Sequence, residues 1–284
     1  MTPKLSIRSR STHAFAPTEI GAVQMVSTPD VERNLTESKH LIAMAVEAGA
    51  KLILLPEYFC SMSHQDSEKL PIAEKFGDGP IQNFLAKISQ HYGIWLISGT
   101  IPLISVKPNR ILNTTIVFKP DGSIAARYNK IHLFEFLTGE ESYDEALTIH
   151  PGDKLCTFES PFGRVGLSIC YDLRFPELYR AMSDCSLMAL PAAFTYTTGR
   201  AHWEILLRAR AIENQCYVLA AAQGGHHENG RHTWGHSMLI DPWGDILAIK
   251  EGEGPGIITG KIESERLTSV RESLPALRHR VFSI

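Results

Sequence analysis

Apolar residues along the 284-residue chain recur with two different spacings, and the two spacings alternate. Short apolar runs, which are typical of buried strands, occupy residues 20–25, 51–57 and 94–103. Residues 30–48 instead place apolar side chains three and four positions apart, with Gly49 as a helix stop, and residues 80–92 predict a second helix. The first part of the chain is therefore predicted to alternate strands with helices.

The second part of the chain repeats this arrangement. Residues 113–130 predict two strands that turn at Asp121-Gly122, a strong hairpin signal. Further elements are predicted as strands at 164–169, 186–192 and 216–223, a helix at 199–214, and a hairpin at 236–249. Because no linker or low-complexity segment divides the chain, we predict a layered α/β fold with buried sheets, in a single domain at residues 19–284.

The composition narrows the class of protein. Hydrophobic residues make up 44% of the chain and charged residues 21%, which is ordinary for a soluble globular protein. The net charge of −3 gives no electrostatic reason to expect nucleic acid or a membrane as a partner, and no apolar run is long enough to cross a bilayer. The five cysteines are odd in number and contain no C-x-x-C pair, which favours a reducing compartment. We therefore expect a cytoplasmic protein.

The first 18 residues are predicted to form a flexible extension. They are basic and rich in serine, and they lack both acidic residues and the apolar segment of a secretion signal. A mitochondrial transit peptide is the alternative to a plain disordered extension.

Cys170 stands at an unusual place, between a predicted strand and a predicted helix. Residues 165–169 are typical of a buried strand, whereas Pro176 and Glu177 are favoured in the first turn of a helix. Free N–H groups at such a turn favour a thiolate and can stabilise an oxyanion, so Cys170 is predicted to be a nucleophile. Three cysteines in or beside strand-like runs are expected to be inert: Cys156, Cys185 and Cys216.

Two charged residues also follow predicted strands. Glu57 ends the apolar run LILLPE, and ligands of α/β folds bind where strands end. Lys130 follows the second strand of the 113–130 hairpin. Taken singly, each residue fits a solvated surface charge equally well, so neither alone predicts a site.

Together with Cys170 these residues form a recognisable pattern. In the order Glu57, Lys130, Cys170, and within the segments LPE, YNKIHLF and CYDLRFPE, they resemble the carbon–nitrogen hydrolase (nitrilase) superfamily. The resemblance runs from Ile20 over nearly the whole chain and is most specific at the cysteine segment. It implies a four-layer α-β-β-α sandwich, with two central mixed sheets flanked by helices, that assembles into a homodimer or larger homo-oligomer. It also implies a Glu-Lys-Cys triad that uses no metal and no other cofactor.

The same family often has a second glutamate between the lysine and the cysteine. In this chain that stretch is EFLTGEESYDEALTIHPGD. Glu145, six residues before the PGD step, fits the family pattern best, and Glu140 or Glu141 is the alternative.

The resemblance implies a role for each of these side chains. Glu57 takes the thiol proton as Cys170 attacks an amide carbonyl and returns it to the leaving nitrogen. Lys130, held as an ammonium by two carboxylates, and the backbone N–H of Tyr171 stabilise the tetrahedral oxyanion. A thioester remains, and water activated by Glu57 hydrolyses it.

The second half of the chain narrows the resemblance. Residues 191–225, with GHSMLIDPWGDILA after them, resemble the ω-amidase branch and, within it, the deaminated glutathione amidases. This branch implies the amide of a small 2-oxo acid as substrate, with 2-oxoglutaramate or an N-carbamoyl amino acid as alternatives to deaminated glutathione. Because such substrates carry carboxylates, Arg174 is predicted to bind one, a salt bridge to Glu177 being the alternative. Phe194 and Thr195, at the end of a predicted strand, are expected to line the pocket.

Three other classes of protein fit parts of the sequence. In GGHHENGRHTWGH, His232 and His236 have a spacing found in zinc sites, but the segment is loop-like and offers only Glu228 as a carboxylate, so no metal site is predicted. A papain-like protease would carry its cysteine near the N-terminus instead of past mid-chain. A non-catalytic binding protein is disfavoured because all three triad residues are present.

Overall fold

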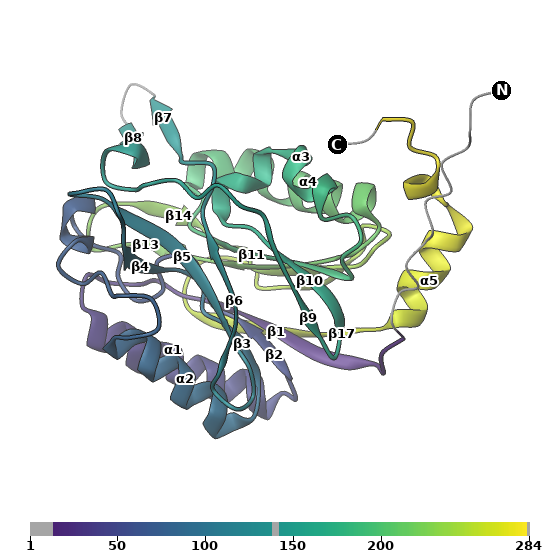
Figure 1. Ribbon diagram of the computed structural model, residues 1–284, viewed down its shortest axis with the longest axis horizontal. Helices are drawn as coiled ribbons and strands as arrows, with labels where there is room; N and C mark the ends of the chain where they lie inside the picture. Colours follow the sequence, from purple (N-terminus) through teal and green to yellow (C-terminus); the bar gives the residue numbers. More distant parts are fainter. Residues whose placement is uncertain (1–13, 138–141, 283–284) are drawn as a thin grey trace.

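The computed structural model describes residues 14–137 and 142–282. Two large sheets stand face to face in it (Figure 1). The strands of the first sheet run in the order β17-β1-β2-β3-β5-β4, with β6 also paired to β5. Their bounds are β1 (Thr18–Gln24), β2 (Leu52–Leu54), β3 (Trp95–Ile97), β4 (Ile101–Ile104), β5 (Ile111–Phe118), β6 (Ile124–Asn129) and β17 (Gly256–Ile262).

The second sheet has the order β16-β15-β12-β11-β10-β9. Its strands are β9 (Cys156–Ser160), β10 (Gly163–Leu167), β11 (Leu187–Ala192), β12 (Tyr217–Ala222), β15 (Met238–Ile240) and β16 (Ile246–Ile249). Each sheet is mixed: β1, β2 and β3 are parallel in the first, and β10, β11 and β12 are parallel in the second, with antiparallel neighbours outside them. Two short ribbons accompany the sheets: β7 (Glu135–Leu137) with β8 (Ser142–Asp144), and β13 (Gly224–His226) with β14 (His232–Trp234).

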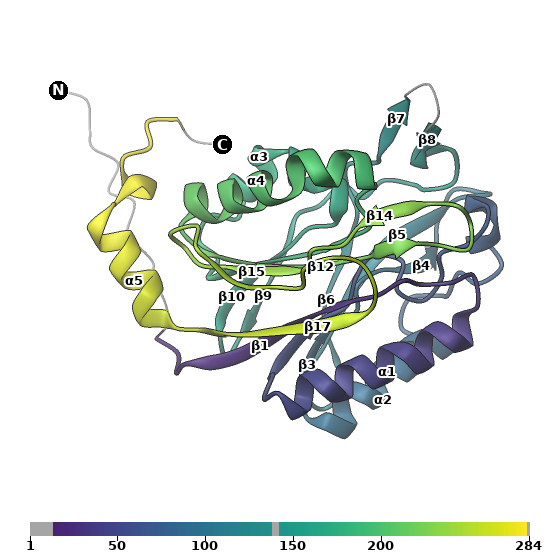
Figure 2. The same cartoon turned by 180° about the vertical axis from the view of Figure 1, so that it is seen from behind.

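Helices cover the outer faces of both sheets. In Figures 1 and 2, α1 and α2 lie outside the first sheet and α3 and α4 lie outside the second, which gives four layers in the order α-β-β-α. The helices are α1 (Val31–Glu47), α2 (Pro80–Tyr92), α3 (Pro176–Ala181), α4 (Tyr196–Asn214) and α5 (Ser264–Ser273). The predicted sandwich is confirmed.

The buried apolar side chains explain this layering. The larger core cluster joins residues of both sheets, among them Ile20, Leu54, Val165 and Leu187, so it fills the space between the sheets. A second cluster, which includes Leu41, Ile42 and Leu85, lies between the first sheet and its two helices. The predicted apolar stripe of residues 30–48 is thus the face that α1 buries.

Local sequence signals set the helix ends. Asp30 caps α1 by accepting a hydrogen bond from the backbone N–H of Arg33. Helix α2 begins with Pro80 and ends at Tyr92, followed by Gly93, whose φ of 62° is the left-handed conformation that glycine adopts at little cost.

The prediction of one strand at 94–103 is wrong. The segment forms β3 and β4, which are separated by a turn at Gly99 with φ 64°. A Cβ at this position would lie 2.1 Å from the carbonyl oxygen of Pro56, so the backbone of the turn packs directly on the LPE segment. The apolar run hides this break because both halves are buried.

The first described residues are bound to the C-terminal helix. The backbone N–H of Phe15 donates to Ser264 Oγ at 3.1 Å, and Ser264 Oγ donates to the Phe15 carbonyl at 2.8 Å. The part of the predicted extension that begins at residue 15 therefore contacts α5, while residues 1–13 lie outside the described range. Over the described residues, none of the helices combines the length and apolar character that a bilayer crossing requires.

Candidate active site

Cys170 lies in a sharp turn between β10 and α3. It is the first residue of a 3₁₀ turn, Cys170–Arg174, and its φ of 49° is left-handed, a strained conformation for a residue with a side chain. The turn directs the backbone from the carboxyl end of β10 into α3, and the Cys170 side chain is only 7% exposed. The predicted strand-to-helix position is correct, and α3 begins at Pro176 as predicted, six residues after Cys170, but it is short.

Asp172 holds this turn together. Its Oδ2 accepts hydrogen bonds from the backbone N–H of Ile169 at 2.8 Å and from the Tyr128 hydroxyl at 2.7 Å. Its Oδ1 accepts one from the backbone N–H of His132 at 3.1 Å and lies 2.7 Å from that residue's Nδ1. Because Tyr128 and His132 flank Lys130 in the chain, one buried carboxylate fixes the cysteine turn against the lysine segment.

Glu57 follows β2 and is 1% exposed. Its Oε1 accepts hydrogen bonds from Lys130 Nζ at 2.9 Å and from Asn113 Nδ2 at 2.8 Å. Its Oε2 accepts one from the backbone N–H of Ala193 at 2.9 Å, and the same N–H also interacts with Cys170. The alternative of a solvent-facing glutamate is wrong, because this carboxylate is buried and its bonded N–H group borders the thiol.

Lys130 is fully buried between two carboxylates. Its Nζ lies 2.9 Å from Glu57 Oε1 and 2.9 and 2.8 Å from the two oxygens of Glu145. Burial by itself would lower the pKa of the amine, but the attraction of Glu145 and then of Glu57 raises it well above its usual value. Lys130 is therefore an ammonium ion, as expected.

Glu145 begins a 3₁₀ turn after β8 and reaches back to Lys130. Its other contacts are the Tyr58 hydroxyl, which donates to Oε1 at 2.8 Å, and the backbone N–H of Phe134, which donates to Oε2 at 2.8 Å. Burial favours a raised pKa, yet Lys130 and these donors hold the pKa of the carboxyl below its usual value. The alternatives Glu140 and Glu141 lie outside the described residues.

The environment of the Cys170 thiol differs from the expectation of a stabilised thiolate. Burial raises its pKa well above that of free cysteine, and the negative charge of Glu57 adds to the effect, while Lys130 opposes it. The resting sulfur is therefore a thiol, and its proton must be removed as the sulfur reacts.

A pocket opens above these groups, and we call it the main pocket. Glu57, Glu145 and Cys170 lie in its wall, and its other lining residues include Phe134, Tyr143, Ala193, Thr195, Arg231 and His232. Asp66 also lines this pocket, and its two carboxylate oxygens lie 3.2 and 3.3 Å from Arg231 Nη2.

Arg174 lies beside Cys170 in a second hollow, together with Phe194 and Thr195. Thr195 also lines the main pocket, whereas Phe194 lines only the second hollow. Arg174 Nη1 is 3.2 Å from His202 Nδ1, and the guanidinium lies over the ring of Phe194. Among the ion pairs of the described residues none involves Arg174, so the alternative of a Glu177 salt bridge is wrong.

Sequence reasoning missed three groups of this site. Asn113 is buried and bonded to Glu57, Tyr58 is bonded to Glu145, and Arg231 reaches the main pocket from the β13–β14 ribbon. Tyr58 follows Glu57 in the chain, which is a usable signal. The positions of Asn113 and Arg231 depend on contacts across 56 and 165 residues, which no local pattern reveals.

Comparison with known proteins gives a family and named relatives. A family model described as carbon-nitrogen hydrolase matches residues 19–272. The deaminated glutathione amidase of Synechocystis sp. is 43% identical over 267 residues, which are 92% of this chain and 97% of that protein. The human omega-amidase NIT2 is 39% identical over 251 residues, which are 87% of this chain and 89% of that protein.

Solved structures agree with this match. The crystal structure of Saccharomyces cerevisiae Nit3, a member of branch 10 of the nitrilase superfamily, has a TM-score of 0.84 and 33% identity, and the match covers 94% of this chain and 97% of that one. A variant of the amidase from Nesterenkonia sp. AN1 shows Michael addition of acrylamide at its active-site cysteine. It has a TM-score of 0.76 and 25% identity over 91% of this chain and 98% of that one.

Proposed function

The chain belongs to the carbon–nitrogen hydrolase family, as a cysteine-dependent amidase of the nitrilase superfamily, and on that premise we propose that Cys170, Glu57, Lys130 and Glu145 hydrolyse the amide of a small 2-oxo acid. The observation that carries the proposal is the buried Lys130 ammonium, bonded to both glutamates beside the thiol in one pocket. Buried ionisable groups with strongly shifted pKa values are common at functional sites, and a buried ammonium beside a nucleophile can stabilise an oxyanion.

Formation of the acyl-enzyme comes first. Glu57 Oε2 takes the proton of the Cys170 thiol as the sulfur attacks the amide carbonyl, which forms a C–S bond and an oxyanion. The oxyanion is stabilised by the Lys130 ammonium and by the backbone N–H of Tyr171. When the C–N bond breaks, Glu57 gives its proton to the nitrogen, and an amine or ammonia leaves.

Hydrolysis of the thioester uses the same residues. Glu57, now a carboxylate again, takes a proton from water as the water oxygen attacks the thioester carbonyl. Lys130 stabilises the second oxyanion, the C–S bond breaks, and the sulfur recovers its proton from Glu57. Glu145 keeps Lys130 charged and in place through both steps, since it bonds the ammonium through both carboxylate oxygens.

The proposed substrate is deaminated glutathione, in which 2-oxoglutarate is joined to a dipeptide by an amide bond. Hydrolysis of this bond would release 2-oxoglutarate and the dipeptide. The similarity to proteins named deaminated glutathione amidase supports this assignment. The charge at one side of the main pocket also supports an acidic substrate. Lys69 and Arg231 both contact the carboxylate of Asp66, at 2.7 and 3.2 Å, so this group of three side chains carries one excess positive charge. Arg174 in the second hollow adds a further guanidinium, and Phe194 and Thr195 are proposed to contact the substrate there.

The second candidate substrate is 2-oxoglutaramate, the unsubstituted amide of the same 2-oxo acid, which would release ammonia instead of a dipeptide. The 39% identity to the human omega-amidase NIT2 favours it. N-carbamoyl amino acids are the third candidate. We also propose, from the family resemblance, that the chain assembles into a homodimer or a larger homo-oligomer; sedimentation equilibrium against the chain mass of 31.6 kDa tests this.

One assay tests the function. Product release is measured side by side for deaminated glutathione, 2-oxoglutaramate, an N-carbamoyl amino acid and a simple nitrile. The expected kcat/KM is highest for deaminated glutathione, lower for 2-oxoglutaramate and negligible for the nitrile. A nitrile as the best substrate would overturn the amidase assignment, and 2-oxoglutaramate as the best substrate would select the second candidate.

A further inference from the structure

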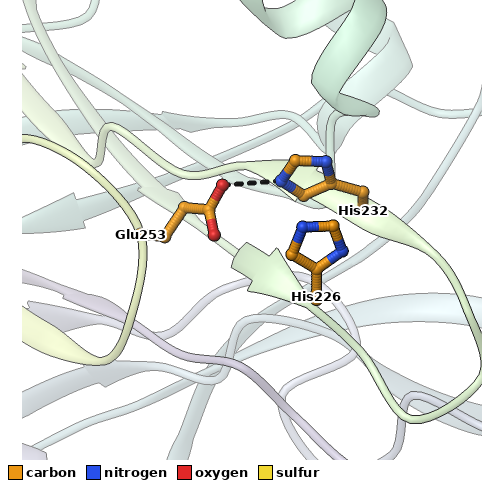
Figure 3. A group of neighbouring side chains, drawn as sticks. All are labelled: His226, His232 and Glu253. Atoms are coloured by element: carbon orange, nitrogen blue, oxygen red, sulfur yellow. Dashed lines mark hydrogen bonds and ion pairs between the residues drawn. The ribbon is translucent and has the colours of Figure 1, made fainter.

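The β13–β14 ribbon places two histidines directly opposite each other. The strands pair antiparallel with His226 opposite His232, so both side chains point to one face of the ribbon. Their imidazole ring centroids are 3.7 Å apart. Figure 3 shows that the carboxylate of Glu253 points toward both rings, with its Oε1 2.6 Å from Nε2 of His232.

The backbone of Glu253 is fixed relative to the ribbon. Gln24, a fully buried residue of β1, donates hydrogen bonds at 2.9 Å to the carbonyl oxygens of Gly252 and Gly254. The backbone N–H of Gly254 donates at 2.8 Å to the carbonyl of Gly224, at the start of β13. The loop is therefore anchored on both sides of Glu253, which keeps its side chain beside the two histidines.

The neighbouring histidines are already used in other ways. Both ring nitrogens of the buried His227 are bonded, to the Ser27 carbonyl at 2.9 Å and to Thr233 Oγ1 at 2.8 Å. His236 stacks on Trp234 and bonds its carbonyl. In contrast, among residues 14–137 and 142–282 the His226 ring has no hydrogen-bond partner, and the His232 ring is bonded only to Glu253.

We propose that His226, His232 and Glu253 bind a divalent transition-metal ion such as Zn²⁺. Two imidazole nitrogens and one carboxylate oxygen form a donor set that zinc takes with a fourth position open. The three donor atoms lie within 4.8 Å of one another, compared with roughly 3.3 Å in a tetrahedral site with Zn–N bonds of about 2.0 Å. All three side chains are at least partly exposed, so rotations about their χ angles can close this difference.

This site lies at the rim of the main pocket but takes no part in the proposed hydrolysis. His232 lines that pocket, and the adjacent Thr233 pairs with Thr195. A bound ion would join the loop at residues 250–255 to the ribbon that forms this rim. The sequence predicts no metal site, and the ligands are not the His232 and His236 pair with zinc-like spacing. His236 bonds the Trp234 carbonyl, and the carboxylate comes from Glu253 instead of Glu228, which pairs with Arg33.

The test is a Zn²⁺ titration of the full-length chain in competition with a chromogenic chelator. Cys170→Ala is used as the background for every protein, so that the thiol cannot bind the ion. We expect one ion per chain, and about a tenfold or greater loss of affinity in His226→Gln and in Glu253→Gln. His40→Gln, on the exposed face of α1, and Glu251→Gln, in the same loop, are the matched controls and should bind as the background does.

A second measurement separates ligation from a general change in the surface. Electron paramagnetic resonance of bound Cu²⁺ should show splitting from two nitrogen ligands, reduced to one in His226→Gln. Equal Zn²⁺ affinity in both site variants and both controls would overturn the proposal, and so would a copper spectrum that the His226 substitution leaves unchanged.

Discussion

At the scale of single residues, Cys170 combines a buried thiol with two neighbouring carboxylates. Because burial and Glu57 raise the pKa of this thiol, the free enzyme holds less thiolate at neutral pH than free cysteine does. The rate of alkylation by iodoacetamide should therefore keep rising up to pH 9. Mass spectrometry after timed quenching gives the rate, and Cys170→Ala, which should lack both label and activity, is the control. A plateau below pH 8, or labelling mainly at Cys60, would contradict this.

Glu145 is the residue whose predicted role is most specific. Its replacement by Gln removes the larger of the two carboxylate attractions that keep Lys130 charged. Because the charged amine is proposed to stabilise the oxyanion in the transition state, kcat should drop by about 100-fold while KM changes little. Steady-state kinetics measures kcat and KM separately and so tests this prediction. Asp144→Asn, at the adjacent pocket residue, is the control. If Glu145→Gln has wild-type kinetics and Glu140→Gln or Glu141→Gln shows a large loss of kcat, the role of second glutamate belongs to that residue instead of Glu145.

Arg174 is the proposed partner of a substrate carboxylate. Replacing it with Leu should reduce kcat/KM for acidic amides by about 10- to 100-fold, the lower end of the cost of breaking a charge pair, because the residue is only half-buried. A neutral amide should lose far less. Arg200→Leu, on an exposed position of α4, is the control. An equal loss for both substrates would make Arg174 structural, and a selective loss in Arg231→Leu instead would place carboxylate binding beside Asp66.

At the scale of elements, the turn between β3 and β4 packs on the segment that carries Glu57, the proposed general base. Gly99→Ala would place a methyl group 2.1 Å from the Pro56 carbonyl, next to Glu57. The matched control is Gly93→Ala, which has nearly the same φ but no atom within 4 Å of the new Cβ. In both variants the left-handed conformation should lower the free energy of unfolding by about 1–2 kcal/mol. The steric clash in Gly99→Ala should lower it by about 1–3 kcal/mol more.

Urea unfolding measures that difference, and turnover is measured on the same samples. Because the added methyl group displaces the Pro56–Glu57 backbone, Gly99→Ala should also lose activity, whereas Gly93→Ala should keep it. Equal stability of the two variants would show that the turn does not pack on the LPE segment.

The elements also show what the sequence could and could not predict. Helix α2 has the predicted bounds, since Pro80 and Gly93 mark its ends and its apolar face is regular. The sequence does not predict strand β17, although this strand pairs along the whole of β1. Its segment GIITGKI shows no strong alternation of apolar and polar residues, and more than 230 residues separate it from β1 in the chain. Long-range pairing of this kind is set by topology, which local patterns do not encode.

At the scale of the whole molecule, the family match confirms what three short motifs suggested. The order of Glu57, Lys130 and Cys170 indicates the family because each residue follows a strand and lies in a short segment that resembles a family motif. The sequence could not show that Glu253 faces His226 and His232, because the loop that carries it is placed by Gln24 from the far end of the chain.

The two sheets each supply only part of the candidate site. Glu57, Asn113 and Lys130 belong to the first sheet and its strand ends, whereas Cys170 and Ala193 follow strands of the second. Enzymatic activity is therefore a reporter of sheet docking during folding. On dilution from urea, far-ultraviolet circular dichroism should recover as soon as separate sheets and helices form, and turnover should return only when the interface between the sheets is dry and packed. Stopped-flow refolding with timed activity assays tests this lag, and simultaneous recovery of both signals would mean that the two sheets fold as one cooperative unit.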